Sequence, residues 1–194
     1  EILLRSVDFA PVAEMQAAGD WAGATRVMVD AARALEAGGA ESVVIASNTM
    51  HRMADEVAAA VSLPLLHIAD ATAAAVTAAG ARAPVLLATR FTMEEDFYRG
   101  RLRERYGIAA RVPGAADRET VHATIYAELC RGIVRDAARA EWRAIIARAR
   151  QAGADAVILG CTEIGLLIGQ GDTDLPVFDT TRLHAEAALD HALA

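Results

Sequence analysis

The sequence predicts an α/β protein built from two related lobes, each with a mainly parallel sheet flanked by helices. Two observations predict this class. Short apolar runs of strand character alternate along the chain with longer stretches of helical character, and strands separated by helices usually pair in parallel. A short passage also occurs twice, which indicates that one lobe repeats the plan of the other.

The repeated passage covers residues 38–49 and again residues 152–163. Each copy has a turn of small residues, an apolar strand, and then a polar residue with a nucleophilic side chain. That residue is Ser47 in the first copy and Cys161 in the second. Because open α/β sheets bind ligands at the carboxyl ends of their strands, two such ends could address one substrate atom from opposite sides.

The individual elements follow from hydrophobic periodicity and from helix end signals. Residues 21–37 have the apolar spacing of an amphipathic helix that Gly38 and Gly39 close. A second pair of similar passages, 63–72 and 175–182, each passes from a strand into a helix and supports the duplication. The expected strands are residues 2–7, 42–46, 64–68, 84–88, 156–159 and 176–178. The expected helices are 21–37, one starting near His51, 71–79, 92–106, 118–132, 139–151 and 181–191.

Composition excludes several classes of function. The net charge of −7 argues against a nucleic-acid partner or an anionic membrane surface, and no apolar run is long enough for a membrane span. Cys130 and Cys161 form no metal-ligand spacing, so we expect no metal and a reduced, cytoplasmic protein. The chain contains no lysine, so a pyridoxal phosphate Schiff base cannot form, and we expect no cofactor.

Several short motifs, taken in order, resemble the aspartate/glutamate racemase family along essentially the whole chain. They are Ser6-Val7-Asp8-Phe9, Ser47-Asn48-Thr49-Met50-His51, residues 65–72, Thr89-Arg90-Phe91-Thr92-Met93, Gly160-Cys161-Thr162-Glu163 and Phe178-Asp179-Thr180. The family usually has Cys-Asn-Thr where this chain has Ser47-Asn48-Thr49. The first motif is therefore most similar to a branch of broad-specificity amino-acid racemases with a hydroxyl residue there.

The resemblance implies a pyridoxal-independent racemase with its active site in the cleft between two pseudosymmetric lobes, and a homodimer. It implies that the closing helix returns to the first lobe, which gives residues 1–68 with 181–194 for one lobe and 69–180 for the other. It also implies an opening strand and a Gly-Gly loop ahead of residue 1, so we expect the sequence to be part of a longer chain.

Three residues are candidates for the proton transfers that racemisation requires. By the resemblance, Cys161 is the base on one face of the substrate, and Ser47 stands on the other. A helix beginning near Ile164 would lower the pKa of the Cys161 thiol from its ordinary ~8.5. A hydroxyl is a far poorer acid and base than a thiol, so His51, four residues further on, could relay protons for Ser47. The alternatives are that Cys161 is a buried apolar residue, that Ser47 has lost its role, and that His51 is a capping or core histidine.

Other residues are candidates for binding the substrate carboxylate and amine. Their amide, hydroxyl, carboxylate or backbone N–H groups could do so. Threonines before helices are commonly caps, and Glu163 could orient a substrate amine or cap its own helix. The candidates are Asn48, Thr49, Thr89, Thr92, Thr162 and Glu163, with Ser6 and Asp8 bordering the site.

Two other functions stay open at this point. A site with Cys161 as its only acid–base group could protonate an enolate from one face, as related arylmalonate decarboxylases do. A protein without a working Ser47 side could instead bind a small acid without catalysis. Decarboxylation of a disubstituted malonate would indicate the first, and tight binding without α-proton exchange would indicate the second.

Overall fold

A computed structural model describes residues 1–194, which divide into two compact units. Unit 1 consists of Glu1–Ile45 and Met50–His67, and unit 2 of Ala46–Thr49 and Ile68–Ala194. The closing helix α9 (Thr180–Leu193) groups with unit 2. The expected lobe boundaries, 1–68 with 181–194 and 69–180, stay a prediction.

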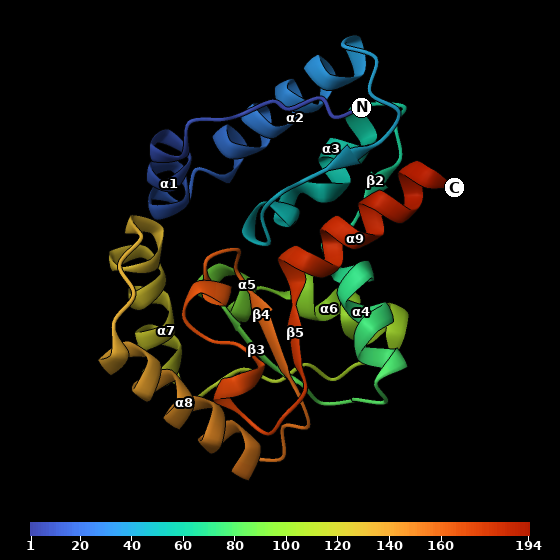
Figure 1. Cartoon of the computed structure of the whole chain (residues 1–194). Helices are drawn as coiled ribbons and strands as arrows, with labels where there is room; N and C mark the ends of the chain where they lie inside the picture. Colours follow the sequence, from blue (N-terminus) through green and yellow to red (C-terminus); the bar gives the residue numbers. More distant parts are fainter. The chain divides into compact units, whose positions relative to one another are not determined.

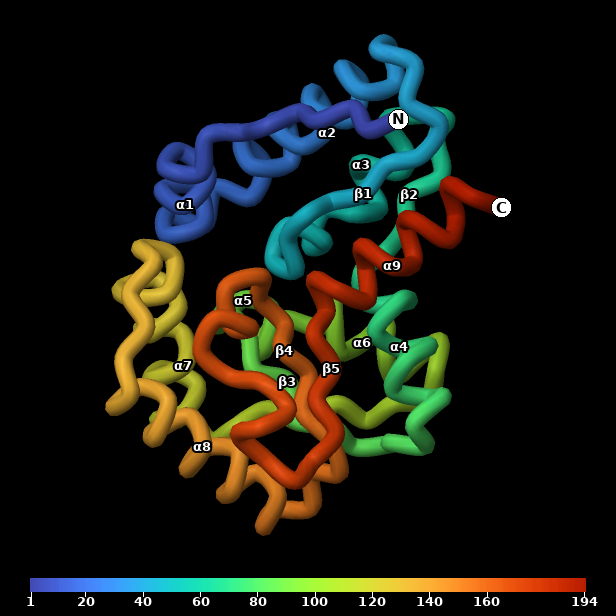
Figure 2. Tube along the Cα trace, in the orientation of Figure 1, coloured from blue at the N-terminus to red at the C-terminus, as the bar shows by residue number.

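Unit 1 has a small parallel sheet and three α-helices. Val43 pairs with Leu65, and Figure 2 shows the two short strands side by side. The core between helices and sheet is apolar and includes Ala24, Ile45 and Met53. The elements are α1 (Phe9–Ala18), α2 (Trp21–Ala37), β1 (Val43–Val44), α3 (Ala54–Ala60) and β2 (Leu65–Leu66), and the 3₁₀ helix η1 (Thr49–Met53) joins β1 to α3.

The predicted helix 21–37 is confirmed at both ends, whereas the predicted strand at residues 2–7 is wrong. No strand pairs with this segment, and Ile2 and Leu4 are 90% and 84% exposed. An alternating or continuous apolar run becomes a strand only where a neighbouring strand can complete its hydrogen bonds. Helix α1, which periodicity did not predict, follows directly, and the Asp8 carboxylate caps it by accepting from the Ala10 N–H.

Unit 2 is a three-layer α/β structure around a parallel sheet with strand order β3-β4-β5. Helices α7 and α8 lie on one side of this sheet and α4 and α6 on the other (Figure 1). The strands are β3 (Val85–Ala88), β4 (Val157–Gly160) and β5 (Val177–Asp179). The α-helices besides α9 are α4 (Ile68–Ala78), α5 (Arg90–Glu94), α6 (Asp96–Tyr106), α7 (Ala115–Ala127) and α8 (Asp136–Gln151). Short 3₁₀ helices are η2 (Leu129–Arg131), η3 (Ile164–Leu166) and η4 (Gln170–Asp172).

The two longest strands are apolar throughout because helices cover both faces of the sheet. Every residue of β3 and of β4 is buried. Their register pairs Ala88 with Gly160 at the carboxyl ends. A Cβ on Gly160 would lie 2.7 Å from Leu86 Cδ1 and 3.0 Å from Ala88 Cβ, so a larger residue there would force Leu86 to move.

Three predicted helices differ in the structure. The helix expected over 118–132 is α7, which ends at Ala127 and is followed by the 3₁₀ helix η2. The helix expected over 92–106 is broken at Glu95, whose extended backbone (ψ 157°) separates α5 from α6. The helix expected to begin near Ile164 is only the three-residue η3. Gly165 and Gly169 follow closely, and glycine is the poorest helix former after proline. No helix of residues 1–194 has the length and apolar character needed to cross a membrane.

Candidate functional site

The carboxyl edge of the unit 2 sheet gathers most of the predicted site residues. Thr89 follows β3 and Cys161 follows β4, and the paired residues Ala88 and Gly160 precede them directly. Thr180 follows β5, whose Asp179 pairs with Leu159. Figure 2 shows the loop after β4, α5 and the start of α9 at this same end of the sheet. Parallel pairing therefore places three polar side chains along one edge.

Three buried threonine hydroxyls form a cluster at this edge. Thr49 Oγ1 lies 2.9 Å from Thr89 Oγ1 and 3.3 Å from Thr92 Oγ1, and the last two are 3.2 Å apart. Thr89 is also the N-cap of α5, since its hydroxyl accepts from the Thr92 N–H at 3.4 Å. Thr89 therefore caps a helix and is also part of the hydroxyl cluster, so the two interpretations do not exclude each other. Hydroxyls both donate and accept, which is the hydrogen-bonding chemistry that a carboxylate site requires.

Asn48 lies beside this cluster and is held by the neighbouring strand ends. Its Nδ2 donates to Thr180 Oγ1 at 3.0 Å, and Thr180 Oγ1 donates to the Leu159 carbonyl at 2.8 Å. Asn48 is only 3% exposed, and its Oδ1 has no hydrogen-bond partner. Thr180 belongs to Phe178-Asp179-Thr180, one of the motifs that carry the family resemblance. It was not predicted as a site residue, because its local pattern is that of an ordinary first residue of a helix.

Cys161 forms a short hydrogen-bonded group with the two residues that follow it. The Cys161 thiol donates to Glu163 Oε2 at 2.9 Å, and the Thr162 hydroxyl donates to the same oxygen at 2.7 Å. Glu163 therefore does not cap its own helix, since η3 has no side-chain cap. Its carboxylate is instead placed to exchange a proton with the thiol.

The pKa of the Cys161 thiol is raised well above its ordinary value, mainly by burial and next by the Glu163 carboxylate. The expected lowering by a helix amino terminus is wrong, because η3 is too short to supply one. The pKa of the Cys130 thiol is raised to about 11 by burial and by Glu163. Cys161 packs partly buried against the core, so its packing role and its hydrogen bond to Glu163 coexist.

An aromatic row near the cysteine was not expected from the sequence. His122 packs edge-on against Phe91 with ring centroids 5.9 Å apart, and against Tyr126 at 4.9 Å. Burial raises the pKa of the Tyr126 hydroxyl, as do the charges on Cys161, Cys130 and Glu163. Burial lowers the pKa of His122, whose Nδ1 accepts from the Arg90 N–H. The available signal was the spacing of His122 and Tyr126, which lie four residues apart in α7.

The remaining predicted residues are spread over both units. Ser47 is partly buried in the loop after β1 and belongs to unit 2 together with Asn48 and Thr49. His51 is buried in unit 1, with its ring 4.5 Å from that of His67. Its proposed relay to Ser47 stays a prediction. Ser6 and Asp8 are exposed in unit 1, where Asp8 caps α1.

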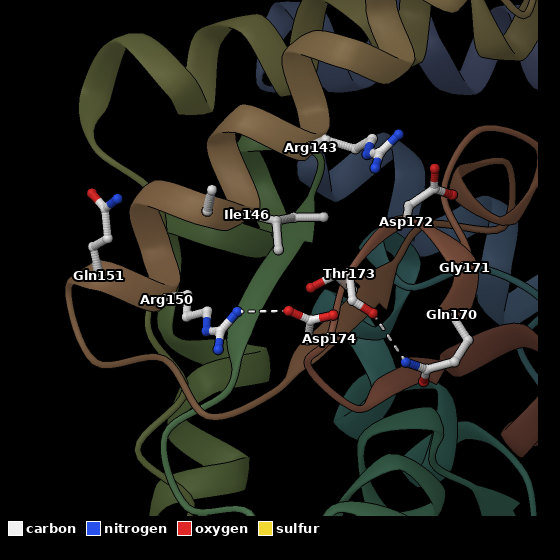
Figure 3. A pocket seen from close by; sticks show the side chains of 10 residues that line it. Arg143, Ile146, Arg150, Gln151, Gln170, Gly171, Asp172, Thr173 and Asp174 are labelled. Carbon is white, nitrogen blue, oxygen red and sulfur yellow. Dashed lines mark hydrogen bonds and ion pairs between the residues drawn. The ribbon is translucent and has the colours of Figure 1, made fainter.

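Residues 1–194 contain no group of three or more His, Cys, Asp or Glu side chains that could hold a metal ion. A groove of about 770 Å³ lies between the end of α8 and the loop 170–174 (Figure 3). Both segments precede strands, so this groove borders the amino edge of the sheet. Its Arg150 and Asp174 are paired at 3.0 Å. The groove is therefore separate from the residues around Cys161.

The raised pKa predicts how Cys161 reacts with iodoacetamide. In a Cys130→Ser background, which leaves Cys161 as the only cysteine, alkylation should be slow at pH 7. It should rise about tenfold per pH unit to beyond pH 9, since only the thiolate reacts. Glu163→Gln removes a neighbouring negative charge and should speed alkylation at each pH. Mass spectrometry measures both rates, and a plateau below pH 8 would contradict the raised pKa.

These positions define the class of the protein. It is an α/β protein whose ionisable and hydrogen-bonding groups for a small ligand gather at the carboxyl edge of a parallel sheet. Residues 1–188 match the family model described as Asp/Glu/Hydantoin racemase, and the chain belongs to this family.

Solved structures agree with this membership. A Yersinia pestis protein described as a "putative Asp/Glu Racemase" is 48% identical, with TM-score 0.90, over 99% of this chain and 84% of that one. An aspartate racemase homologue from Pyrococcus horikoshii is 35% identical, with TM-score 0.84, over 100% and 84%. A glutamate racemase from Francisella tularensis, in complex with D-glutamate, is 16% identical, with TM-score 0.70, over 89% and 64%, and shares the fold.

The predicted family and the predicted α/β fold with helix-flanked parallel sheets are confirmed. The family and the similar structures support a racemase-type function, and hence an isomerase. The assignment to the branch with a hydroxyl residue at Ser47 stays a prediction.

Proposed function

We propose that this protein is a pyridoxal-independent amino-acid racemase that inverts Cα by proton transfer on two faces. The observation that carries the proposal is the pairing of Ala88 with Gly160, which sets the Thr89 cluster beside Cys161. Cys161 would be the base and acid on one face, and Ser47, assisted by His51, on the other. An aspartate, a glutamate or a broader set of amino acids would be the substrate.

The Cys161–Glu163 hydrogen bond supports a balanced first step. Glu163 would take the thiol proton, which leaves the thiolate to remove the proton from Cα and become a thiol again. The raised pKa makes this thiolate a stronger base once formed. A substrate ammonium group nearby would favour the thiolate, because an opposite charge stabilises it. The electron pair left on Cα would be delocalised into the substrate carboxylate. Ser47 would then give its hydroxyl proton to the other face of Cα, and His51 would replace the proton that Ser47 gives up.

The polar residues around Cys161 would hold the substrate. The hydroxyls of Thr49, Thr89 and Thr92 and the backbone and hydroxyl of Thr162 would bind the α-carboxylate, and Asn48 would accept from the amine. Ser6 and Asp8 would border the site. Residues 1–194 contain no lysine that could hold pyridoxal phosphate as a Schiff base.

The test is α-proton exchange in D₂O with a panel of L- and D-amino acids, followed by NMR and chiral chromatography. Exchange with inversion that Ser47→Ala abolishes would support the two-sided mechanism. Exchange with retained configuration, unaffected by Ser47→Ala, would overturn the role of Ser47. An absence of exchange with every amino acid would overturn the racemase, and tight binding in that case would indicate a binding protein. His51→Ala with an unchanged rate and pH profile would overturn the relay.

A further inference from the structure

The amide oxygen of Asn48 is buried without a partner, although the rest of the side chain is well held. Asn48 is 3% exposed, its Nδ2 donates to Thr180, and its Oδ1 accepts nothing. Buried polar atoms are nearly always paired, because an unpaired one loses its hydration without compensation. An orphaned acceptor beside a cluster of hydroxyls therefore indicates the place of a ligand N–H or O–H donor.

The orientation of this amide is imposed by Thr180. Amide nitrogen and oxygen are similar in shape, so their positions follow from the hydrogen bonds available. The Thr180 hydroxyl has one proton, which it donates to the Leu159 carbonyl at 2.8 Å. Toward Asn48 it can then only accept, so Nδ2 must face Thr180 and Oδ1 must face away.

Thr180 is placed to hold this orientation firmly. Its side chain is completely buried, and it begins α9 directly after β5. The carbonyl it binds belongs to β4, whose Leu159 pairs with Asp179 of β5. The hydroxyl thus connects Asn48 to two adjacent strands, and sheet pairing fixes the distance between them.

We propose that Thr180 is a positioning residue that presents Asn48 Oδ1 to the α-ammonium group of the substrate, and so selects α-amino acids over acids without the amine. This inference rests on the proposed function of the same site. With the hydroxyl removed, the amide can rotate and present Nδ2, which repels an ammonium group. A carboxylic acid that lacks the amine does not use Oδ1 and should bind as before.

The test uses calorimetry to compare binding of the amino acid that binds most tightly among the exchange panel with binding of the same acid without its α-amino group. Thr180→Val should weaken binding of the amino acid roughly tenfold or more, the scale of one hydrogen bond to a charged group. It should leave the acid lacking the amine unchanged. Thr180→Ser, which keeps the hydroxyl, should restore the discrimination. The matched control Thr181→Val, at an exposed position one residue further on, should behave as the parent.

A purely structural role would weaken both ligands alike, and this result overturns the inference. The inference is also overturned if Asn48→Ala loses the preference for the amino acid over the acid without the amine while Thr180→Val keeps that preference. Asn48 would then act without Thr180. Failure of the racemase itself is visible separately, as absence of exchange in D₂O with discrimination intact. If Thr180→Val does not fold, ¹⁵N NMR of the parent decides. The Asn48 side-chain amide, assigned with Asn48→Asp, should exchange slowly with solvent, and rapid exchange would overturn the inference.

Discussion

Replacing Cys161 with serine should lower the rate of α-proton exchange on the order of 10³-fold, within the range of a general acid or base. Serine keeps the size of the side chain and can still donate to Glu163, so the fold and substrate binding should be retained. What is lost is the thiolate, because a hydroxyl does not ionise near neutral pH. The rate is measured by deuterium incorporation at Cα.

The chain offers a matched control for this experiment in Cys130, its only other cysteine. Cys130 also lies near the Glu163 charge, and its pKa is likewise raised. Cys130→Ser should nevertheless exchange at the parent rate, since Cys130 lies in η2 and does not follow a sheet strand. Equal losses in the two variants would show that general damage to this region, not the Cys161 thiol, explains the effect.

Replacing Trp142 with alanine should cost about 3–5 kcal/mol of the free energy of unfolding, the usual range for a buried tryptophan. Trp142 of α8 is completely buried in the core of unit 2, together with Ile145 and Ile146 of the same helix. Removing the indole leaves a large cavity beneath the sheet that carries Cys161. Urea unfolding followed by circular dichroism measures the loss.

Phenylalanine at position 142 should cost much less than alanine. It keeps an aromatic ring in the core, and it removes an indole N–H that has no hydrogen-bond partner. Burying such a group costs about 1–3 kcal/mol, which offsets part of the lost packing. In this variant Trp21 is the remaining tryptophan, and its fluorescence reports on unit 1 alone. Circular dichroism reports on both units, so a difference between the two signals would separate their unfolding. A larger loss for Phe than for Ala would contradict this account.

Much of the fold could be predicted because it depends on local pattern. Helix α2 matches its predicted ends, and β3 begins one residue later than expected and ends where predicted. Cys161 follows its strand, as the repeated passage indicated. Parallel pairing then follows from strands separated by helices. These features depend on the apolar spacing of neighbouring residues and on glycine positions, which the sequence displays directly.

The contacts within the site could not be predicted, because they join residues distant in sequence. Thr49 meets Thr89 across 40 positions, and no periodicity links them. The pKa of Cys161 was expected to fall, and it rises, mainly because the thiol is buried and next because of the Glu163 carboxylate. The expected helix that would have lowered it is only a short 3₁₀ turn. Local preference placed a helix after Cys161, but two glycines within six residues outweigh the apolar run.

Residues Ala46–Thr49 belong to unit 2 although both flanking stretches belong to unit 1, and this has a consequence for biosynthesis. The bond from Asn48 to Thr180 closes a loop of 132 residues. Closing such a long loop costs conformational entropy, which a single hydrogen bond does not offset. We therefore expect the Asn48–Thr180 bond to form after the sheet that positions Thr180. A ribosome therefore exposes Asn48 and Thr49 long before their partners exist. The residues of this edge come together only after Thr180 has been made.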